Sequence, residues 1–349
     1  MFVGGDFSQQ EPRLLAAYSN DETMIQAYKD QKDLYATIAA GVYHNDYWDN
    51  MEHRQDGSAN PEGKKRRSAC KSLLLGMMYG RGPSSIAEQI GSSVQEAQGI
   101  IDNFYGQFPK VKVWMDDTQT FAKENGYVED MWGRRRRLPD IQLPKYTVKM
   151  KNKVDSFNPL LYTMGKVNDE SSKLIAKYNK KLEGVVYKKD YSVIQQEAEK
   201  EGVVIINNGA FISQAERQCV NARIQGGAAS MTKVCMRKIF DNEELKKLDA
   251  HLAIQIHDEV IMEVPEENAE KAAEILSLTM RTCVKDTVVT PFKCDTYVVK
   301  KWYEDDFGDS LKMYKKKYMD KGMSEEEAFN KLLEENSELT EEELIKLLS

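Results

Sequence analysis

Four residues between positions 67 and 79 recur at every fourth position and carry side chains suited to chemistry. They are Arg67, Lys71, Leu75 and Tyr79. On a helix this spacing keeps side chains on one face, so two cations, an apolar side chain and a phenol would lie together. Arg suits a bidentate contact with phosphate oxygens, and Lys suits a point-charge contact. The face therefore suits a nucleoside triphosphate, although taken alone it is equally well interpreted as a basic, solvent-facing helix.

A site that handles a triphosphate also needs carboxylates that hold divalent metal ions. Asp6 and Asp258 supply such a pair, and Glu259 is a weaker neighbour. Asp6 ends an expected strand directly before an expected helix, so its carboxylate can face a cleft. A helix cap is the alternative role for Asp6. We predict that Asp6 and Asp258 are metal ligands.

The elements that must position these residues follow from hydrophobic periodicity and turn signals. A strand is expected at 1–6 and a helix at 11–18, and 252–257 and 260–264 alternate as the two strands of a hairpin whose bend holds His257, Asp258 and Glu259. Helical segments are expected at 21–43, 68–108, 110–125, near 170–181, at 214–242 and at 268–284, with a strand at 292–299 and two polar helices from 309 onward. The pattern predicts an α+β fold.

The segment 141–211 differs from its surroundings in composition. It is rich in Lys, Tyr, Asn and Asp and shows little periodicity apart from the helix near 170–181. This is typical of an inserted surface subdomain or a partly disordered segment. Its lysines could touch nucleic acid, but a solvated face is the favoured interpretation.

Composition bounds the class of protein. With 41% hydrophobic and 30% charged residues among 349, the chain can bury a core and remain soluble. The net charge of −7 argues weakly against a nucleic-acid partner, but basic clusters at 64–67 and 134–137 and an acidic region at 324–349 make local charge more informative. That acidic end is interpreted as a solvated end or a protein-interaction helix pair.

Five cysteines, widely spaced and without a CxxC pair, fit neither a disulfide framework nor a zinc site. No signal peptide and no membrane-spanning run is evident. We therefore expect a reducing, cytoplasmic location and no membrane partner.

Taken together, the three segments resemble the sequence motifs of family A DNA polymerases, the bacterial polymerase I type. Residues 6–13 resemble motif A, 67–80 motif B and 255–259 motif C, in the family's order and with its wide separation. Further resemblance runs through 126–129, 133–135 and 138–141, and through Arg217, Asn221 and 225–226. It covers about two-thirds of the chain, and lapses within 141–211 and after about 302.

The resemblance implies an antiparallel palm sheet with packed helices plus a mainly helical fingers subdomain. In these terms 1–20 is the first part of the palm, 21–140 the fingers, 141–211 the insertion, 212–308 the second part of the palm and 309–349 an acidic helical tail. It also implies transfer of a nucleotidyl group from a dNTP to a primer 3′-hydroxyl, with release of pyrophosphate.

Roles at the catalytic and nucleotide sites follow from the resemblance. Asp6 and Asp258, with the backbone carbonyl of Phe7, would hold two Mg²⁺, for which Mn²⁺ can substitute. Arg67 and Lys71 would bind the triphosphate, and Lys71 would also protonate the leaving pyrophosphate. Glu11 would lie under the sugar as a gate against a 2′-hydroxyl, close to Tyr79. The resemblance also places Glu259 at the catalytic site. It places Gln9 and Leu75 at the nucleotide site.

Primer–template DNA has its own expected contacts. Arg217, Asn221 and Gln225 are four apart, so they share a helical face that can line the minor groove. Minor-groove acceptors are nearly the same for every base pair, which lets such a face check pair shape without reading sequence. His257 would touch the primer end, although taken alone it is better interpreted as a hydrogen-bonded hairpin histidine.

Two departures weaken particular roles. Leu75 stands where family members usually carry Phe or Tyr, so discrimination against dideoxynucleotides does not follow. Tyr35 stands where a phosphate-contacting His is common, which puts that contact in doubt.

The sequence begins almost on motif A, which suggests the C-terminal half of a split polymerase of phage or prophage type. The expected partner is a separate N-terminal polypeptide that carries the thumb and an exonuclease-like domain, without which the chain could be inactive. Any proofreading would come from that partner. Without that partner, one edge of the palm sheet would be left unpaired or exposed.

Two other functions remain open at this point. One is a non-catalytic DNA-binding or assembly remnant of a polymerase. Primer extension with and without Asp258→Ala would distinguish this remnant from a catalytic polymerase. The other, ranked lower, is a single-subunit RNA polymerase. Glu11 and Glu259 favour deoxynucleotides, and comparing dNTP with rNTP incorporation would decide.

Overall fold

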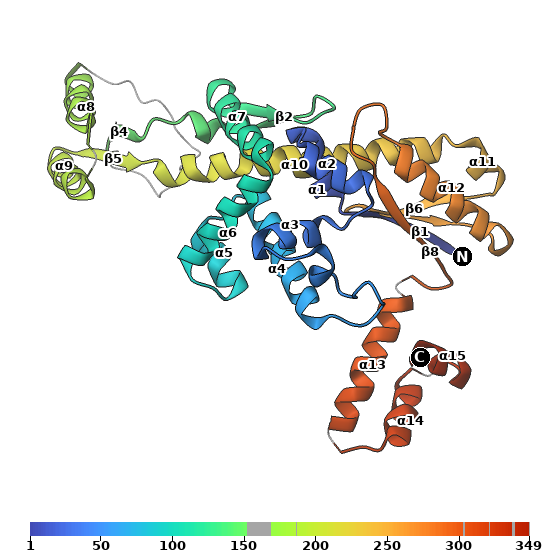
Figure 1. The fold of residues 1–349 in the computed structure, drawn as a ribbon. Helices are drawn as coiled ribbons and strands as arrows, with labels where there is room; N and C mark the ends of the chain where they lie inside the picture. The colour runs from blue at the N-terminus through green and yellow to red at the C-terminus, as the bar shows by residue number, and fades with distance from the viewer. Residues whose placement is uncertain (152–168, 186, 303, 321, 337–338, 349) are drawn as a thin grey trace. The chain divides into compact units, whose positions relative to one another are not determined.

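A computed structural model describes residues 1–151, 169–185, 187–302, 304–320, 322–336 and 339–348 (Figure 1). It divides into two compact units, each described here by itself. Unit 1 contains residues 1–10 and 231–349, and unit 2 contains residues 11–230. Helices and antiparallel sheets occur in both, so the predicted α+β class is confirmed.

Unit 1 contains a four-stranded antiparallel sheet. Its order is β6 (His251–Ile256), β7 (Glu259–Glu263), β1 (Phe2–Ser8) and β8 (Lys293–Val299). Helix α12 (Ala269–Thr282), which follows the short helices α11 (Glu243–Lys247) and η3 (Glu266–Asn268), packs against β1 and β8. The strands predicted at 1–6, 252–257, 260–264 and 292–299 are confirmed, with bounds shifted by one or two residues.

Unit 2 is built mainly from helices with clear caps. In chain order they are α1 (Gln10–Ser19), α2 (Glu22–Lys29), α3 (Leu34–Tyr43), η1 (Tyr47–Asn50), α4 (Pro61–Met78), α5 (Pro83–Ile90), α6 (Val94–Gln107) and α7 (Pro109–Asn125). The side chains of Asp21, Asp33, Asn60 and Ser93 accept backbone hydrogen bonds at four of the helix starts. Helix α4 begins earlier than the predicted position 68, because Asn60 caps it and proline occupies its first turn.

One apolar core holds these helices together. Its fully buried members include Leu34, Ile38, Leu73, Leu74, Met78, Phe104 and Phe108. Helix α4 therefore buries one side against its neighbours, and the opposite side stays available. The strands β2 (Tyr127–Glu129) and β3 (Arg135–Arg137), followed by η2 (Pro139–Gln142), form a small hairpin in the same unit.

Helix α10 (Gly209–Phe240) is 32 residues long and begins in unit 2, with its residues from 231 onward in unit 1. The predicted helix at 214–242 is thereby confirmed.

The described part of the insertion is folded. Strands β4 (Tyr146–Met150) and β5 (Val203–Asn207) pair antiparallel, and helices α8 (Asp169–Leu182) and α9 (Lys188–Lys200) lie beside them (Figure 1). They share a small core of Tyr178, Leu182, Ala198, Val203 and Ile205. The helix expected near 170–181 is confirmed, whereas α9 and both strands were not predicted. Residues 152–168 of the insertion lie outside the described residues.

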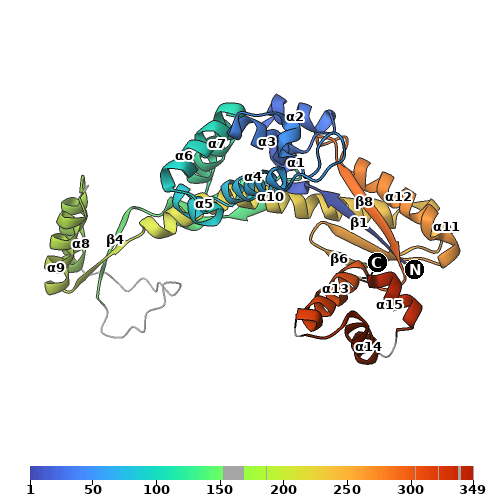
Figure 2. The same ribbon diagram turned by 60° about the horizontal axis from the view of Figure 1, so that its bottom comes forward.

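The acidic end folds as three helices rather than the two predicted. They are α13 (Glu304–Asp320), α14 (Glu325–Glu335) and α15 (Glu341–Leu348), which lie together in Figure 2. Leu311, Leu332, Leu339 and Leu344 form their buried core. The prediction missed the last break, at which Thr340 and Glu343 bond to each other's backbone N–H. Among the described helices, none is both long and apolar enough to cross a membrane.

Candidate functional site

A row of carboxylates crosses the sheet of unit 1. Asp6 on β1 pairs across the strands with Glu259 on β7 and with Asp295 on β8. Because directly opposed residues in a sheet share a face, the three side chains lie on the same side. Gly5 is the neighbour of Asp6 and therefore presents its side-chain position to the other face, where an added Cβ would meet Met280 and Leu276 of α12. The carboxylates therefore occupy the sheet face opposite α12.

The bend between β6 and β7 brings Asp258 to the same end of β1. The backbone N–H of Phe7 donates to the carbonyl oxygen of Asp258 at 3.4 Å. His257 turns the chain with a left-handed backbone, φ 50°, and its carbonyl accepts a 2.7 Å hydrogen bond from the Gln255 side chain. The sequence prediction that His257, Asp258 and Glu259 lie at a hairpin bend is confirmed.

The electrostatics of Asp6 reflect this crowding. Its side chain reaches solvent, yet the adjoining strands remove part of its water. This burial, followed by the negative charges of Asp258, Glu259 and Asp295, raises the pKa of Asp6 to about 6, against a smaller lowering by the Phe7 N–H. Asp6 and Asp258 are thus close enough to repel each other.

A divalent cation fits these donors. Carboxylate and carbonyl oxygens are the ligands that Mg²⁺ prefers, and a cation would offset the mutual repulsion. In the described part of the chain no group of three or more His, Cys, Asp or Glu side chains is arranged around a metal position. The predicted set has only two such side chains, Asp6 and Asp258, with one backbone carbonyl.

Tyr297 is a residue of this site that sequence reasoning missed. Its hydroxyl donates to Oε1 of Glu259 at 2.6 Å. It reaches there by lying across Gly4, where an added Cβ would stand 2.0 Å from the Tyr297 ring. The Gly4–Gly5 pair before Asp6 was the available signal, because glycine in a strand often marks a close approach.

Helix α4 of unit 2 carries the predicted triphosphate face. Arg67, Leu75 and Tyr79 are partly exposed along it, and Lys71 is exposed. Burial acts to lower the pKa of Arg67, but the hydrogen bond and charge of Asp33, together with Glu52, raise it above its ordinary value. The Arg67 guanidinium also lies over the Tyr35 ring, 5.5 Å from its centre.

Tyr79 joins two other predicted residues. Its hydroxyl donates to Oε2 of Glu11 at 3.0 Å, and the side chain of Gln225 on α10 also hydrogen-bonds it. Burial, then the nearby Glu11 carboxylate, raises the pKa of the phenol. The expected proximity of Glu11 and Tyr79 is confirmed, and the contact with Gln225 is new.

The predicted primer–template residues lie on one outward face of α10. Arg217 and Gln225 are exposed and Asn221 is partly exposed. Gly80, which ends the α4 turn with φ 72°, lies so close to α10 that an added Cβ would be 2.6 Å from Cβ of Arg217. Gln9 occupies the turn between β1 and α1, also with a left-handed backbone.

Arg223 was passed over because it faces away from the Arg217 row. Its guanidinium lies over the rings of Tyr18 and Trp114 and donates to Thr118 Oγ1 at 2.7 Å and to the carbonyl of Glu129. Burial lowers its pKa. Arg223 therefore ties α10 to α7 and β2 behind the exposed face.

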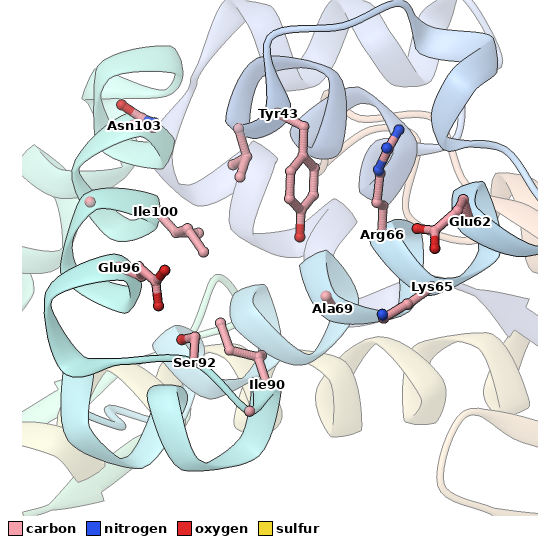
Figure 3. A pocket seen from close by; sticks show the side chains of 13 residues that line it. Tyr43, Glu62, Lys65, Arg66, Ala69, Ile90, Ser92, Glu96, Ile100 and Asn103 are labelled. Atoms are coloured by element: carbon pink, nitrogen blue, oxygen red, sulfur yellow. The ribbon is translucent and has the colours of Figure 1, made fainter.

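A surface pocket of about 630 Å³ lies on the other side of α4 (Figure 3). Lys65, Arg66 and Ala69 line it from α4, and Arg66 stands over the Tyr43 ring. These positions lie roughly opposite Arg67 and Lys71 on the helix. The pocket is therefore separate from the predicted triphosphate face.

Comparison with known proteins gives a family match over most of the chain. The model of DNA polymerase family A matches residues 1–162 and 165–304. The thermostable DNA polymerase I of Thermus filiformis is 26% identical over 304 residues, 87% of this chain and 27% of that protein. DNA polymerase theta of Drosophila melanogaster is 28% identical over 309 residues, 86% of this chain and 11% of that protein.

DNA polymerase I of Chloroflexus aurantiacus is 26% identical over 305 residues, 87% of this chain and 24% of that protein. The chain therefore spans about a quarter of the length of these bacterial relatives. Among solved structures, the polymerase domain of Pol1 from M. smegmatis, in complex with DNA primer–template and dNTP, is similar in fold. Its TM-score is 0.60 at 20% identity, over 86% of this chain and 40% of that one.

Proposed function

The chain belongs to DNA polymerase family A, and we propose on that basis that it carries the palm-and-fingers portion of a template-directed DNA polymerase. The reaction joins a primer 3′-oxygen to the α-phosphorus of a dNTP and releases pyrophosphate. The observation that carries the proposal is the pairing of Asp6 with Glu259 on adjacent strands, beside the bend that holds Asp258. Two motifs about 250 positions apart in sequence thus meet in one cluster of acids.

Two Mg²⁺ would be held by Asp6 and Asp258 with the backbone carbonyl of Phe7, and Mn²⁺ would substitute. The hard oxygen donors and the raised pKa of Asp6 support this assignment. When bound, the ions neutralise triphosphate charge and favour ionisation of the primer hydroxyl. Glu259, held by Tyr297, keeps further negative charge beside the pair.

Arg67 and Lys71 would orient the triphosphate. Within the described residues, the exposed Lys71 side chain makes no ion pair, so its ammonium group is available for a phosphate oxygen. Lys71 would then give a proton to the oxygen that leaves with pyrophosphate. Gln9 and Leu75 would complete the nucleotide contacts.

Glu11 would stand under the sugar and exclude a 2′-hydroxyl. The hydrogen bond from Tyr79 supports this role because it fixes the carboxylate in one place. Gln225 reaches the same phenol from α10, which supports a continuous surface from the nucleotide to the primer–template row of Arg217 and Asn221. His257 would contact the primer end.

A test of the triphosphate face compares two lysines of α4. Lys71→Ala should lower the rate of dNTP incorporation on a primed template by about 10²-fold or more, because it removes a phosphate contact and a proton donor. Lys65→Ala, which removes the same charge on the pocket side, should change the rate less than about 2-fold. Equal losses in both variants would mean that α4 acts only as a general basic surface.

The separate N-terminal polypeptide with a thumb and an exonuclease-like domain stays a prediction, as does its phage or prophage origin. Its test is to compare primer extension by the chain alone with extension after the candidate polypeptide is added. Equal rates would remove the need for a partner.

A further inference from the structure

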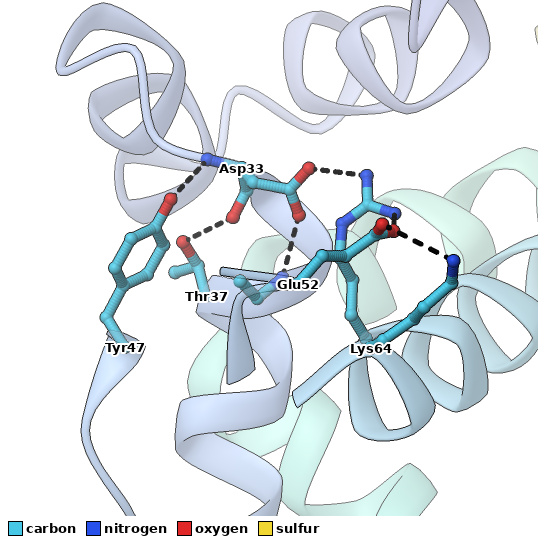
Figure 4. Close-up of polar contacts among 7 residues, drawn as sticks. Asp33, Thr37, Tyr47, Glu52 and Lys64 are labelled. Atoms are coloured by element: carbon cyan, nitrogen blue, oxygen red, sulfur yellow. Dashed lines mark hydrogen bonds and ion pairs between the residues drawn. The ribbon is translucent and has the colours of Figure 1, made fainter. Parts of the chain in front are cut away.

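Arg67 is held by two carboxylates (Figure 4). Its Nη2 donates to Oδ2 of Asp33 at 2.8 Å, and its Nη1 donates to Oε1 of Glu52 at 3.1 Å. Both terminal nitrogens of the guanidinium therefore have an anionic partner. Each terminal nitrogen keeps a second N–H, so a phosphate oxygen can still reach the guanidinium, but it must do so against the negative charge of the two carboxylates.

The first partner, Asp33, is fixed by its surroundings. Its Oδ1 caps helix α3 by accepting from the Ala36 N–H at 2.9 Å, and its carbonyl accepts from the Thr37 hydroxyl. Its own N–H donates to the Tyr47 hydroxyl at 3.0 Å. With a side chain only 13% exposed, Asp33 cannot move without breaking the start of α3.

The second partner, Glu52, is held loosely. It lies in the segment between η1 and α4, and its side chain is 38% exposed. Its other oxygen is 3.8 Å from the ammonium group of Lys64, which is 66% exposed. Exposed ion pairs of this kind contribute little to stability and weaken with salt. Figure 4 shows Lys64 on the side of Glu52 away from Asp33.

We propose that Asp33 is a positioning residue that fixes Arg67, and that Glu52 is a built-in competitor, whose carboxylate holds one N–H of Nη1 and opposes an incoming triphosphate by its charge until the triphosphate displaces it. Lys64 gives the displaced Glu52 carboxylate another cation to pair with. This inference rests on the proposed function, because it assumes that Arg67 binds the triphosphate. It assigns the two carboxylates opposite effects on nucleotide affinity.

The consequence is a threshold for anions. A triphosphate brings several charges and meets Arg67 and Lys71 together, so it can displace one exposed carboxylate. An anion of lower charge gains less from the same face and competes less well. Removing the charge of Glu52 should therefore strengthen binding of weak anions as well as of the triphosphate.

The experiment measures binding to the full chain by calorimetry in Mg²⁺ and low salt, with dATP and inorganic tripolyphosphate as the two probes. Glu52→Gln should lower Kd for both probes by about 3- to 5-fold, the range of an exposed ion pair. Asp33→Asn should raise Kd by about 10-fold or more, because Arg67 loses its buried partner. Asparagine also caps helices well, so α3 should keep its start and melting temperature.

Two controls separate the possible outcomes. Glu62→Gln removes the same charge from α4 at a side chain with no contact to Arg67, and should leave Kd within about 2-fold. The gain from Glu52→Gln should vanish near 0.5 M salt, where exposed pairs are screened.

If Glu52→Gln weakens binding or leaves it unchanged while Arg67→Ala abolishes it, the competitor role is wrong and the proposed function stands. If Arg67→Ala binds both probes as well as the wild type, the triphosphate face itself is wrong, and this inference falls with it. The two failures are thus distinguishable.

Discussion

Asp6 and Arg67 differ in the charges that surround them: Asp6 lies beside other acids, and Arg67 lies beside carboxylates of opposite charge. Asp6 is crowded by acids, and burial followed by Asp258, Glu259 and Asp295 raises its pKa to about 6. Arg67 forms ion pairs with Asp33 and Glu52. In the first arrangement acids outnumber the nearby cation Lys293, which pairs with Asp295 at 3.0 Å. The second already contains negative charge beside its cation. Under the proposed function, a metal ion would offset the repulsion around Asp6, and a triphosphate would compete with the carboxylates around Arg67.

The contact between Gly4 and Tyr297 gives a prediction at this scale. In Gly4→Ala the new methyl carbon would fall 2.0 Å from the Tyr297 ring, so the ring or the strand must shift. We expect the free energy of unfolding to fall by about 1–3 kcal/mol, the usual cost of overpacking. Thermal unfolding followed by circular dichroism measures it. The displaced Tyr297 should also release Glu259.

Gly99→Ala is the matched control. Gly99 lies within α6, and an added Cβ there meets no heavy atom within 4 Å. The same substitution should stabilise by about 0.5–1 kcal/mol, because alanine favours the helix. If Gly4→Ala proved as harmless as Gly99→Ala, Tyr297 would have room to spare and its fixed contact with Glu259 would be wrong.

At the scale of elements, the parts that the sequence predicted are those with a local signal. The hairpin of β6 and β7 follows from alternation on both sides of His257 and Asp258. Helix α10 lies in a long stretch without proline, which the sequence already indicated as helical. The grouping of Arg67, Lys71 and Tyr79 follows from spacing alone. Asp6 and Asp258 were paired through their resemblance to known motifs, since 250 intervening residues leave no local signal.

The missed parts depend on contacts that are distant in sequence. Strand β4 pairs with β5 more than fifty residues later, so neither strand has a local partner in the sequence. The apolar, β-branched run of β5 was an available signal that the prediction did not use. Helix α9 packs Tyr191, Ile194 and Ala198 on one face at helical spacing, a signal that the prediction also missed. The carboxylate partners of Arg67 could not be predicted either, because Asp33 reads as a helix cap and Glu52 as a loop residue.

The insertion gives a prediction at the element scale. The N–H of Asn208 donates to the carbonyl of Lys145 at 2.9 Å, so the two ends of the insertion meet. Its core is also distinct from that of the surrounding helices. Replacing 146–207 with Asn-Gly, which favours a two-residue turn, should leave a soluble protein that melts within about 4 °C of the full chain.

A partial deletion is the control for that variant. Removing 152–200 while keeping β4 and β5 uncovers Val203 and Ile205, which the helices bury. This smaller deletion should aggregate or lower the melting temperature, because it exposes an apolar sheet face. Aggregation of the complete replacement instead would show that the insertion supports the rest of unit 2.

At the scale of the whole molecule, charge is unevenly distributed. Residues 304–349 hold 14 of the 56 acidic and 7 of the 49 basic side chains, so the rest of the chain is formally neutral. The weak argument from net charge against a nucleic-acid partner therefore concerns the three-helix end alone. That end has a core of its own, which the expectation of a simple solvated end did not include.

The predictions of a cytoplasmic location and of an N-terminal partner belong to this scale, and both stay predictions. Family membership is shown, and the proposed activity is the claim on which the account depends.

The most direct test is single-turnover incorporation on a hairpin primer–template, supplied in large excess so that weak grip on DNA does not limit the reaction. The account predicts that the wild-type chain adds the complementary dNTP in Mg²⁺, that rNTP is added far more slowly, and that Asp258→Asn lowers the rate by about 10³-fold. Incorporation at the same rate by wild type and Asp258→Asn would contradict it.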